Sequence, residues 1–255
     1  MEKNLTITER IPRFSVLAGI GAISVYIFSS IPFVFIVALI KVANLQAQGA
    51  GLAEQDLQTV LKDLTNDPWV LVGGLIVQCV CLFIYAYGLS LIRGTGNPFN
   101  DFGIRFTKSC LLFIPAGLGL QIFGLVIGIP LTILRKSNEE QAVVTTVRDS
   151  RGASFLVLMF LVAIIVPFAE ELCFRGIFMR GLNKKVVPFT AVFITGALFA
   201  GIHLLDPGAL LGTTTLLIFG FLASGLAMYR GRIDASICLH IGFNLTTVFV
   251  LIFTR

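Results

Sequence analysis

Long apolar runs separated by short polar segments make up most of the chain. These runs cover residues 14–42, 69–92, 109–134, 155–179, 188–205, 209–229 and 236–253. About 20 apolar residues cross the hydrocarbon core of a bilayer as one α-helix. The pattern therefore predicts an all-α, polytopic helical bundle with seven transmembrane helices, or eight if the charged connector 135–152 also enters the membrane.

Prolines and polar residues in and between the runs predict where helices bend and begin. Pro32 lies inside the first run and predicts a kink there. Apolar residues at helical spacing within the polar segment 43–68 predict a short amphipathic helix at the membrane surface. Asn66, Asp67 and Pro68 then form a stop and start signal before the second membrane helix.

The composition agrees with a membrane protein. Of 255 residues, 56% are hydrophobic and 13% charged, and the mean hydropathy is +0.92, whereas soluble domains carry about 25% charged residues. The net charge of +5 comes from basic residues in short segments between apolar runs, so we expect no nucleic-acid partner. The five cysteines are odd in number and show no CxxC spacing, which predicts neither disulfides nor a zinc site.

The distribution of Lys and Arg predicts the orientation. With seven spans and a cytoplasmic N-terminus, eleven basic residues lie on the inner side and six on the outer side. We therefore expect an integral protein of the cell membrane with its N-terminus in the cytoplasm. We also expect a single membrane domain over residues 1–255, in which 1–150 carry no motif and 151–255 carry the chemistry.

Three ionisable residues interrupt the fourth apolar run. A charge at the bilayer centre costs about 2.5–3.5 kcal/mol on insertion scales, so Glu170, Glu171 and Arg175 need partners. Glu171 and Arg175 are four residues apart and can pair on one helix face. Glu170 is turned about 100° away from Glu171, which leaves it as the candidate for chemistry. The alternative is a structural ion-pair network between helices.

Both histidines of the chain lie in later membrane runs. His203 shares a helix face with Phe199, and His240 shares one with Asn244, because each pair is four residues apart. The helical rise places Glu170 about 18 Å and His203 about 22–24 Å from the turn between their helices. His240 lies only about 6–8 Å beyond the 230–235 turn, so it joins them only if that turn dips inward or its helix starts deeper.

These groups are those that water-activated amide cleavage requires. Glu170 is the candidate general base, and His203 is a candidate to orient the water or share its proton. His240 and Asn244 are candidate donors to the developing oxyanion. The chain contains no nucleophile-elbow serine and no HExxH motif, which disfavours serine catalysis.

Three motifs resemble one family of membrane proteins. They are Glu170-Glu171-Leu-Cys-Phe-Arg175, Phe199-Ala-Gly-Ile-His203 and His240-Ile-Gly-Phe-Asn244. In this order they resemble the EExxxR, FxxxH and HxxxN motifs of the CAAX protease and bacteriocin-processing family (CPBP, or Abi), which is related to the type II CAAX prenyl endopeptidase. The resemblance covers roughly residues 155–250.

The resemblance implies an intramembrane endopeptidase. It implies that Glu170 activates water with His203 as its partner, that His240 and Asn244 hold the oxyanion, and that Glu171 and Arg175 shape the site together with Phe199. It further implies a peptide substrate, such as a prenylated CAAX-type peptide or a bacteriocin or signal peptide, that meets the enzyme among membrane lipids.

Other interpretations stay open at this stage. The family is also described as intramembrane metalloproteases, and Glu170, His203 and His240 could then be zinc ligands, although we expect no cofactor because their spacing matches no familiar zinc pattern. A non-catalytic immunity or scaffold protein that binds a peptide partner is the second class. A proton-coupled transporter is the third, but the two halves show no internal repeat.

Overall fold

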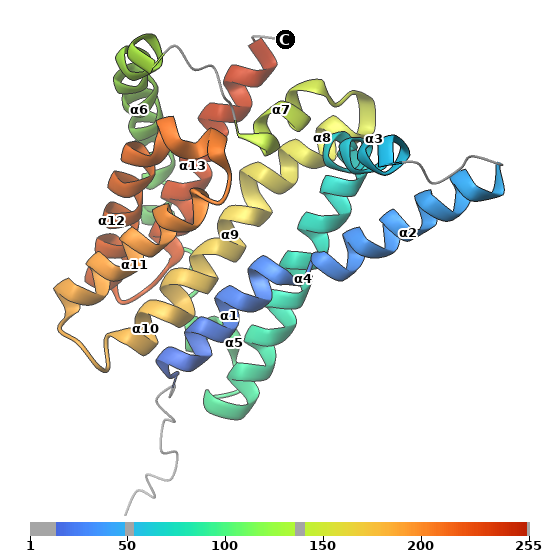
Figure 1. The fold of residues 1–255 in the computed structure, drawn as a ribbon. Helices are drawn as coiled ribbons and strands as arrows, with labels where there is room; N and C mark the ends of the chain where they lie inside the picture. The colour runs from blue at the N-terminus through green and yellow to red at the C-terminus, as the bar shows by residue number, and fades with distance from the viewer. Residues whose placement is uncertain (1–13, 49–53, 136–140, 254–255) are drawn as a thin grey trace, which may run out of the picture.

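The structure is a computed structural model that describes residues 14–48, 54–135 and 141–253. Within these ranges every regular element is a helix, and no strand occurs. Figure 1 shows the helices packed side by side in one bundle, with α2 projecting from it. The predicted all-α class is therefore confirmed for the part of the chain that is described.

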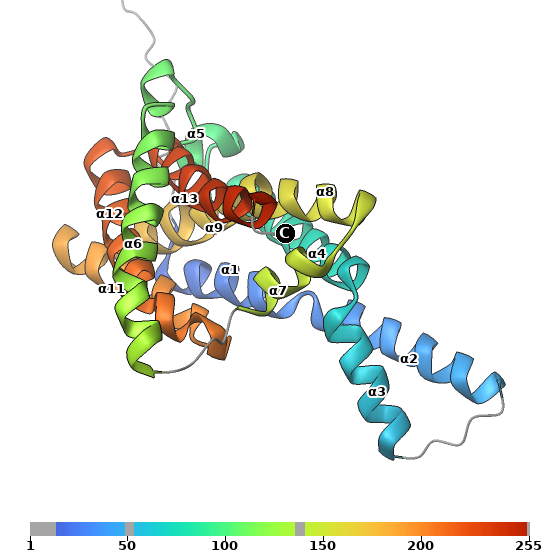
Figure 2. The ribbon, with the colours of Figure 1, turned by 90° about the horizontal axis from the view of Figure 1, so that it is seen from above.

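The N-terminal apolar run bends between two helices. The first apolar run becomes two helices, α1 (Val16–Phe28) and α2 (Ile31–Ala47), with a break at Ser29 and Ser30. Pro32 stands in the first turn of α2, where its missing N–H costs nothing, so the bend predicted there is confirmed. The amphipathic helix α3 (Glu54–Asn66) follows. Figure 2 shows α2 and α3 extending away from the bundle, and these two helices are called the arm below.

Among the described residues, four further helices and a 3₁₀ turn follow before the run that carries the two glutamates. Asp67 caps α4 (Pro68–Arg93) by accepting hydrogen bonds from two backbone N–H groups, as the stop and start signal predicts. A short helix, α5 (Pro98–Phe102), and a 3₁₀ turn, η1 (Lys108–Cys110), lead into α6 (Phe113–Arg135). Helix α7 (Ala142–Asp149) occupies part of the charged connector.

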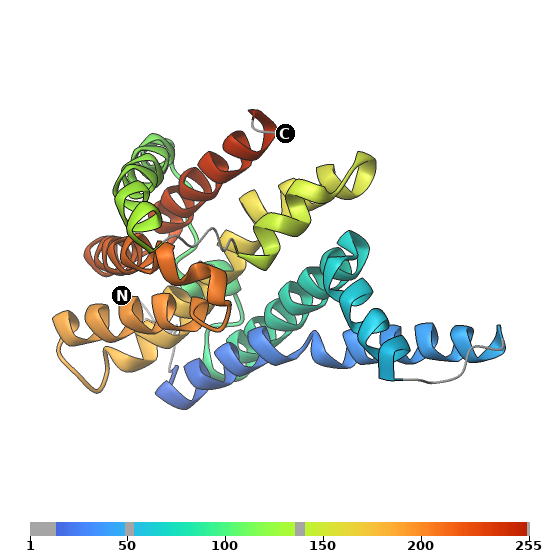
Figure 3. The ribbon, with the colours of Figure 1, turned by 45° about the horizontal axis from the view of Figure 1, so that its top comes forward.

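The run that carries the two glutamates alternates between α and π geometry. It is built from α8 (Gly152–Phe160), the π-helix η2 (Leu161–Ile165), α9 (Val166–Glu171), the π-helix η3 (Leu172–Phe178) and α10 (Met179–Leu182). Figure 3 shows this run between α1 and α4 on one side and α13 on the other. Its glutamates can therefore be reached by residues from both halves of the chain.

The last helices pack closely through glycine. They are α11 (Pro188–His203), the 3₁₀ segment η4 (Pro207–Gly212), α12 (Thr213–Arg230) and α13 (Asp234–Phe253). Gly196 of α11 and Gly220 of α12 meet backbone to backbone, and Gly117 of α6 lies against the backbone of Leu239 on α13. A side chain at these positions would hold the helices apart, so the glycines permit the contact.

The turn between α12 and α13 starts exposed at Gly231 and ends buried at Ile233. Ile233 and Asp234 are 1% and 0% exposed, and the Ile233 amide donates to the carbonyl of Gly103 in the loop after α5. Arg180 also donates to the carbonyls of Asp101 and Gly231, which ties the loop to the turn. Helix α13 thus begins inside the protein, and a deeper start of this helix is one of the two conditions under which His240 was expected to reach the glutamates.

Five of the described helical segments are long and apolar enough to cross a membrane. They are Val16–Ala47, Pro68–Arg93, Lys108–Gly128, Gly152–Leu182 and Asp234–Phe253. Helix α11 is apolar but has only 16 residues. An integral membrane protein is thus confirmed, whereas the count of seven or eight spans and the single domain over 1–255 stay predictions.

The orientation also stays a prediction. Three of its eleven inner-side basic residues, Lys3, Arg10 and Arg13, lie outside the described residues. So do Lys136 and Arg255, which were counted on the outer side.

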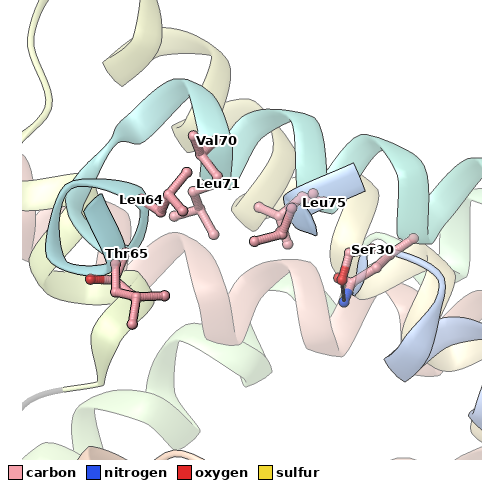
Figure 4. Close-up of a pocket in the computed structure, with 10 residues that line it drawn as sticks. Ser30, Leu64, Thr65, Val70, Leu71 and Leu75 are labelled. Atoms are coloured by element: carbon pink, nitrogen blue, oxygen red, sulfur yellow. Dashed lines mark hydrogen bonds between the residues drawn. The ribbon is translucent and has the colours of Figure 1, made fainter. Parts of the chain in front are cut away.

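An apolar groove of about 280 Å³ lies between the arm and α4 (Figure 4). Leu64, Val70, Leu71 and Leu75 line much of it. At one end Gln78 donates a hydrogen bond to the Ser30 hydroxyl, at 3.1 Å. The groove contains none of the residues of the three motifs, but Ser30 is only four residues beyond Tyr26.

Candidate active site

The buried Glu171–Arg175 pair is the centre of the site. The Arg175 guanidinium donates to Glu171 Oε1 at 2.8 Å, and both side chains are 0% exposed. This confirms the pairing predicted from their spacing of four residues. Because an uncompensated charge in this environment is costly, each group makes the other tolerable inside the bundle.

The rest of the Arg175 side chain is held by α11 and α12. Its Nε donates to the Ser224 hydroxyl and one terminal nitrogen to the Gly220 carbonyl, each at 3.1 Å. The guanidinium carbon lies 4.6 Å from the centroid of the Phe199 ring, a distance typical of a cation–π contact. Arg175 therefore links the glutamate helix to both neighbouring helices.

His240 lies between the two adjacent glutamates. Its Nδ1 is 3.0 Å from Glu171 Oε1, and its Nε2 is 3.5 Å from Glu170 Oε2. A neutral imidazole can donate from one nitrogen only, whereas the protonated ring donates from both. The Glu171 contact fixes the plane of the ring and leaves Nε2 facing Glu170, so α13 does reach the glutamates.

Glu170 differs from its neighbour in access. Its side chain is 13% exposed, against 0% for Glu171. Neither of its oxygens pairs with Arg175: Oε1 accepts a hydrogen bond from the Tyr26 hydroxyl at 3.2 Å, and Oε2 faces His240. The inference that one arginine cannot serve both carboxylates is confirmed, and Glu170 is the carboxylate that a small molecule can approach.

Asn244 lies one turn beyond His240 and contacts the first π-helix. Its Nδ2 donates to the Val162 carbonyl at 2.8 Å. In η2 the Val166 amide bonds back to Leu161, five residues earlier, so the next amide in this register belongs to residue 167. That residue is Pro167, which has no N–H. Asn244 therefore satisfies a carbonyl that the proline leaves without a helical partner, and its second amide hydrogen can serve another acceptor.

His203 is the last residue of α11, and its ring packs against Phe199. Its Nδ1 is 2.7 Å from the Phe199 carbonyl and must carry the proton, since a carbonyl only accepts. The Phe199 ring is 4.7 Å from the His203 ring and 5.6 Å from the His240 ring, centroid to centroid. Among the described contacts His203 has none with Glu170, and it is His240 that approaches the base candidate.

One participant was missed by the sequence interpretation. Tyr26 belongs to α1, in the part of the chain that carried no motif, and it lies 144 positions from Glu170. The sequence signal is a tyrosine in an apolar helix that also contains Ser24, and this by itself does not identify a partner.

The described side chains offer few donors for a metal ion. Over residues 14–48, 54–135 and 141–253, no group of three or more His, Cys, Asp or Glu side chains is arranged to hold a metal ion. Glu170 and His240 are adjacent, whereas His203 bonds to its own helix. The zinc alternative has no built ligand set here and stays a hypothesis for direct measurement.

A cavity of about 210 Å³ lies between Arg175 and the turn before α13. It is bordered by Arg175 and Arg180 and by apolar residues of α10 and α12. Its volume would hold several water molecules, at about 30 Å³ each in the liquid. Arg175 therefore borders a space large enough for water.

Part of the chain matches a known protein family. Residues 152–246 match the family model described as "Type II CAAX prenyl endopeptidase Rce1-like". The matched segment begins at α8 and ends within α13, so it contains all three motifs. No curated protein and no solved structure matched the chain.

Proposed function

We propose that this protein is an intramembrane endopeptidase that uses water activated by Glu170, and the match of residues 152–246 to the Rce1-like family of type II CAAX prenyl endopeptidases supports this. The observation that supports this most is the placement of Glu170. It is the less buried of two adjacent carboxylates, it has no arginine partner, and an imidazole nitrogen lies 3.5 Å from it. A general base needs an accessible oxygen and a neighbour that can share the proton.

The proposed reaction is a hydrolysis with balanced proton transfers. Glu170 removes a proton from water as the water oxygen bonds to the peptide carbonyl carbon, and the carbonyl electron pair moves to its oxygen. The proton then passes to the amide nitrogen as the C–N bond breaks. His203, whose Nδ1 carries its proton, has Nε2 left as an acceptor that can orient the water.

His240 and Asn244 are proposed to stabilise the oxyanion. Asn244 has one amide hydrogen beyond the one donated to Val162. His240 donates from Nε2 when the ring is protonated, with Glu171 holding Nδ1. Removing one such donor typically costs about 10²–10³ in kcat. Glu171, Arg175 and Phe199 then shape the site without touching the substrate.

The substrate is proposed to be a peptide with an apolar or lipidated segment. The groove beside α4 is lined mainly by apolar side chains, and its Ser30 end is four residues from Tyr26, which contacts Glu170. An apolar chain lying there would place the adjoining peptide near the base. A prenylated CAAX-type peptide and an unmodified bacteriocin or signal peptide are the two classes to compare.

The test is peptide cleavage by purified protein in lipid. We expect wild type to cleave at least one peptide of a lipidated and unlipidated panel, and Glu170→Gln to lower kcat by about 10²–10⁴. Asp63→Asn, which alters an exposed carboxylate on α3, is the matched control and should retain the wild-type rate. Equal rates for wild type and Glu170→Gln would end the assignment.

Two further measurements separate the remaining alternatives. Cleavage with and without chelator, together with the metal content of active protein, decides between a glutamate-dependent and a zinc-dependent reaction. If Glu170→Gln retains full biological activity in cells, the non-catalytic immunity or scaffold function is favoured instead.

A further inference from the structure

Tyr26 brings a hydroxyl group from helix α1 to the carboxylate proposed as the base. It donates to Glu170 Oε1 at 3.2 Å across 144 positions of the chain. It lies outside residues 152–246, and none of the three motifs includes it. The contact joins two residues that are far apart in the sequence, inside a largely apolar helix bundle. Burying a hydroxyl there without a hydrogen-bond partner would be costly, so the contact satisfies the Tyr26 hydroxyl.

Helix α1 is held against the glutamate run by close backbone contacts. A Cβ at Gly19 would meet Phe178 of η3, and one at Gly181 would meet the Ser15 backbone. On its other side, Tyr85 of α4 donates to the Ala18 carbonyl at 2.9 Å. The contacts at Gly19 and Gly181 therefore hold helix α1 against the glutamate run without the Tyr26 hydroxyl, and Tyr26 is one of the partly buried residues that pack against the core.

The contact divides the two oxygens of Glu170 between two helices. Oε1 accepts from Tyr26 on α1, while Oε2 faces His240 Nε2 on α13. A carboxylate on a flexible side chain would otherwise rotate about its last torsion, which has a broad energy well. With one oxygen tied to α1, the other keeps its aim toward the imidazole.

We propose that Tyr26 is a positioning residue that fixes the orientation of the Glu170 carboxylate for proton removal from water. This rests on the proposed function, in which Glu170 is the base. Tyr26 keeps its own proton throughout and bonds to no atom of the substrate. Each carboxylate oxygen has two lone pairs, so Oε1 and Oε2 both retain a site for the water while the two contacts are made.

The test compares two tyrosines that each give one hydrogen bond at α1. Tyr26→Phe removes the contact with Glu170, and Tyr85→Phe removes the contact with the Ala18 carbonyl. A hydrogen bond to a charged group is worth about 1.5–3 kcal/mol, so we expect Tyr26→Phe to lower kcat about ten- to one-hundredfold. KM should stay within about twofold, because ground-state binding is unaffected. Tyr85→Phe should keep the wild-type kcat.

The outcomes separate this proposal from the proposed function. If wild type cleaves and Glu170→Gln does not, the base assignment stands whatever Tyr26→Phe does. A kcat for Tyr26→Phe equal to that of wild type or of Tyr85→Phe would then overturn the role of Tyr26 alone. A change confined to KM would also overturn it, since that would mean a substrate contact.

A measurement independent of activity covers the case in which Tyr26→Phe is poorly folded. The unfolding temperatures of Tyr26→Phe, Glu170→Gln and the double variant form a cycle. Because the two side chains share one bond, the double variant should lose less than the sum of the single losses. Strictly additive losses would mean that the contact does not exist in the membrane-embedded protein, and the proposal would fail.

Discussion

The helices that carry the three motifs and the arm formed by α2 and α3 handle polar groups in opposite ways. Around the site, Glu171 and Arg175 are 0% exposed and His240 is 4% exposed at the side chain, and each is tied to a neighbour. On the arm, α2 has no buried residue at all, and its ion pair, Lys41 with Asp67, is about one-third exposed. The site therefore buries its charged side chains, whereas the ion pair of the arm stays solvated. Asp101 on α5 and Asp234 at the start of α13 are buried as well.

This difference in burial predicts where the fold tolerates substitutions poorly. A buried carboxylate that loses its cation cannot turn to water, whereas an exposed one is simply solvated. Substitutions at the site should therefore be costly and those on the arm small. Helix α1 belongs to the first class although it is continuous with the arm, because Tyr26 contacts Glu170 and Gly19 packs on Phe178.

The largest expected loss of stability follows removal of the buried cation. Arg175→Leu leaves Glu171 without its cation, with only the His240 contact remaining, and removes the bonds to Ser224 and Gly220. Breaking a buried pair from one side costs about 3–5 kcal/mol. Unfolding followed by circular dichroism in detergent would measure it.

The control for this prediction replaces both charges. In Glu171→Leu with Arg175→Leu no charge is left alone, and replacement of a whole pair by apolar residues is often close to neutral. The double variant should be more stable than Arg175→Leu. A double variant that is less stable would contradict the view that desolvation of a lone charge dominates here.

Local spacing was enough to predict part of this site. The Glu171–Arg175 pair follows from i,i+4 geometry, and the separate direction of Glu170 follows from a rotation of about 100° per residue. The position of His240 did not follow, because a depth count from the turn assumes that the turn lies at the surface. Ile233 at the end of the turn and Asp234 at the start of α13 are 1% and 0% exposed, and the Ile233 amide bonds to the loop after α5, so the helix begins inside the protein.

Contacts between distant segments could not be predicted from the sequence. Tyr26 and Glu170 meet because α1 packs on η3, and nothing in either local pattern encodes that pairing. The bond from Asn244 to Val162 depends on a π-turn that meets Pro167, and π segments have no clear sequence signature. The helix order and the bend before Pro32 were predicted, since these depend on apolar runs and proline alone.

A smaller loss is expected where α6 meets α13 through glycine. A Cβ at Gly117 would meet the Leu239 carbonyl and the Phe243 amide, which are backbone groups that cannot move aside. We expect Gly117→Ala to cost about 1–3 kcal/mol of unfolding free energy. Gly119→Ala on the same helix meets nothing within 4 Å and should be neutral or stabilising, by up to about 1 kcal/mol. Equal effects at the two positions would mean that α6 does not pack here.

The smallest effect is expected on the arm, at the pair between Lys41 and Asp67. Lys41 Nζ lies 3.5 Å from Asp67 Oδ2, and both side chains are about one-third exposed, at 32% and 33%. Asp67 has a second task, because its Oδ1 accepts from the Trp69 amide at 2.9 Å and caps α4. Lys41→Gln removes only the ion pair, which is worth about 0–1 kcal/mol when solvated.

Asp67→Ala removes the cap as well, at about 0.5–2 kcal/mol, and should therefore be the more costly change. Unfolding free energies of the two variants, compared at low and high salt, would separate the contributions, since only the ion pair is screened. If Lys41→Gln proved as costly as Asp67→Ala and independent of salt, the pair would have to be desolvated in the membrane. The arm would then resemble the site rather than contrast with it.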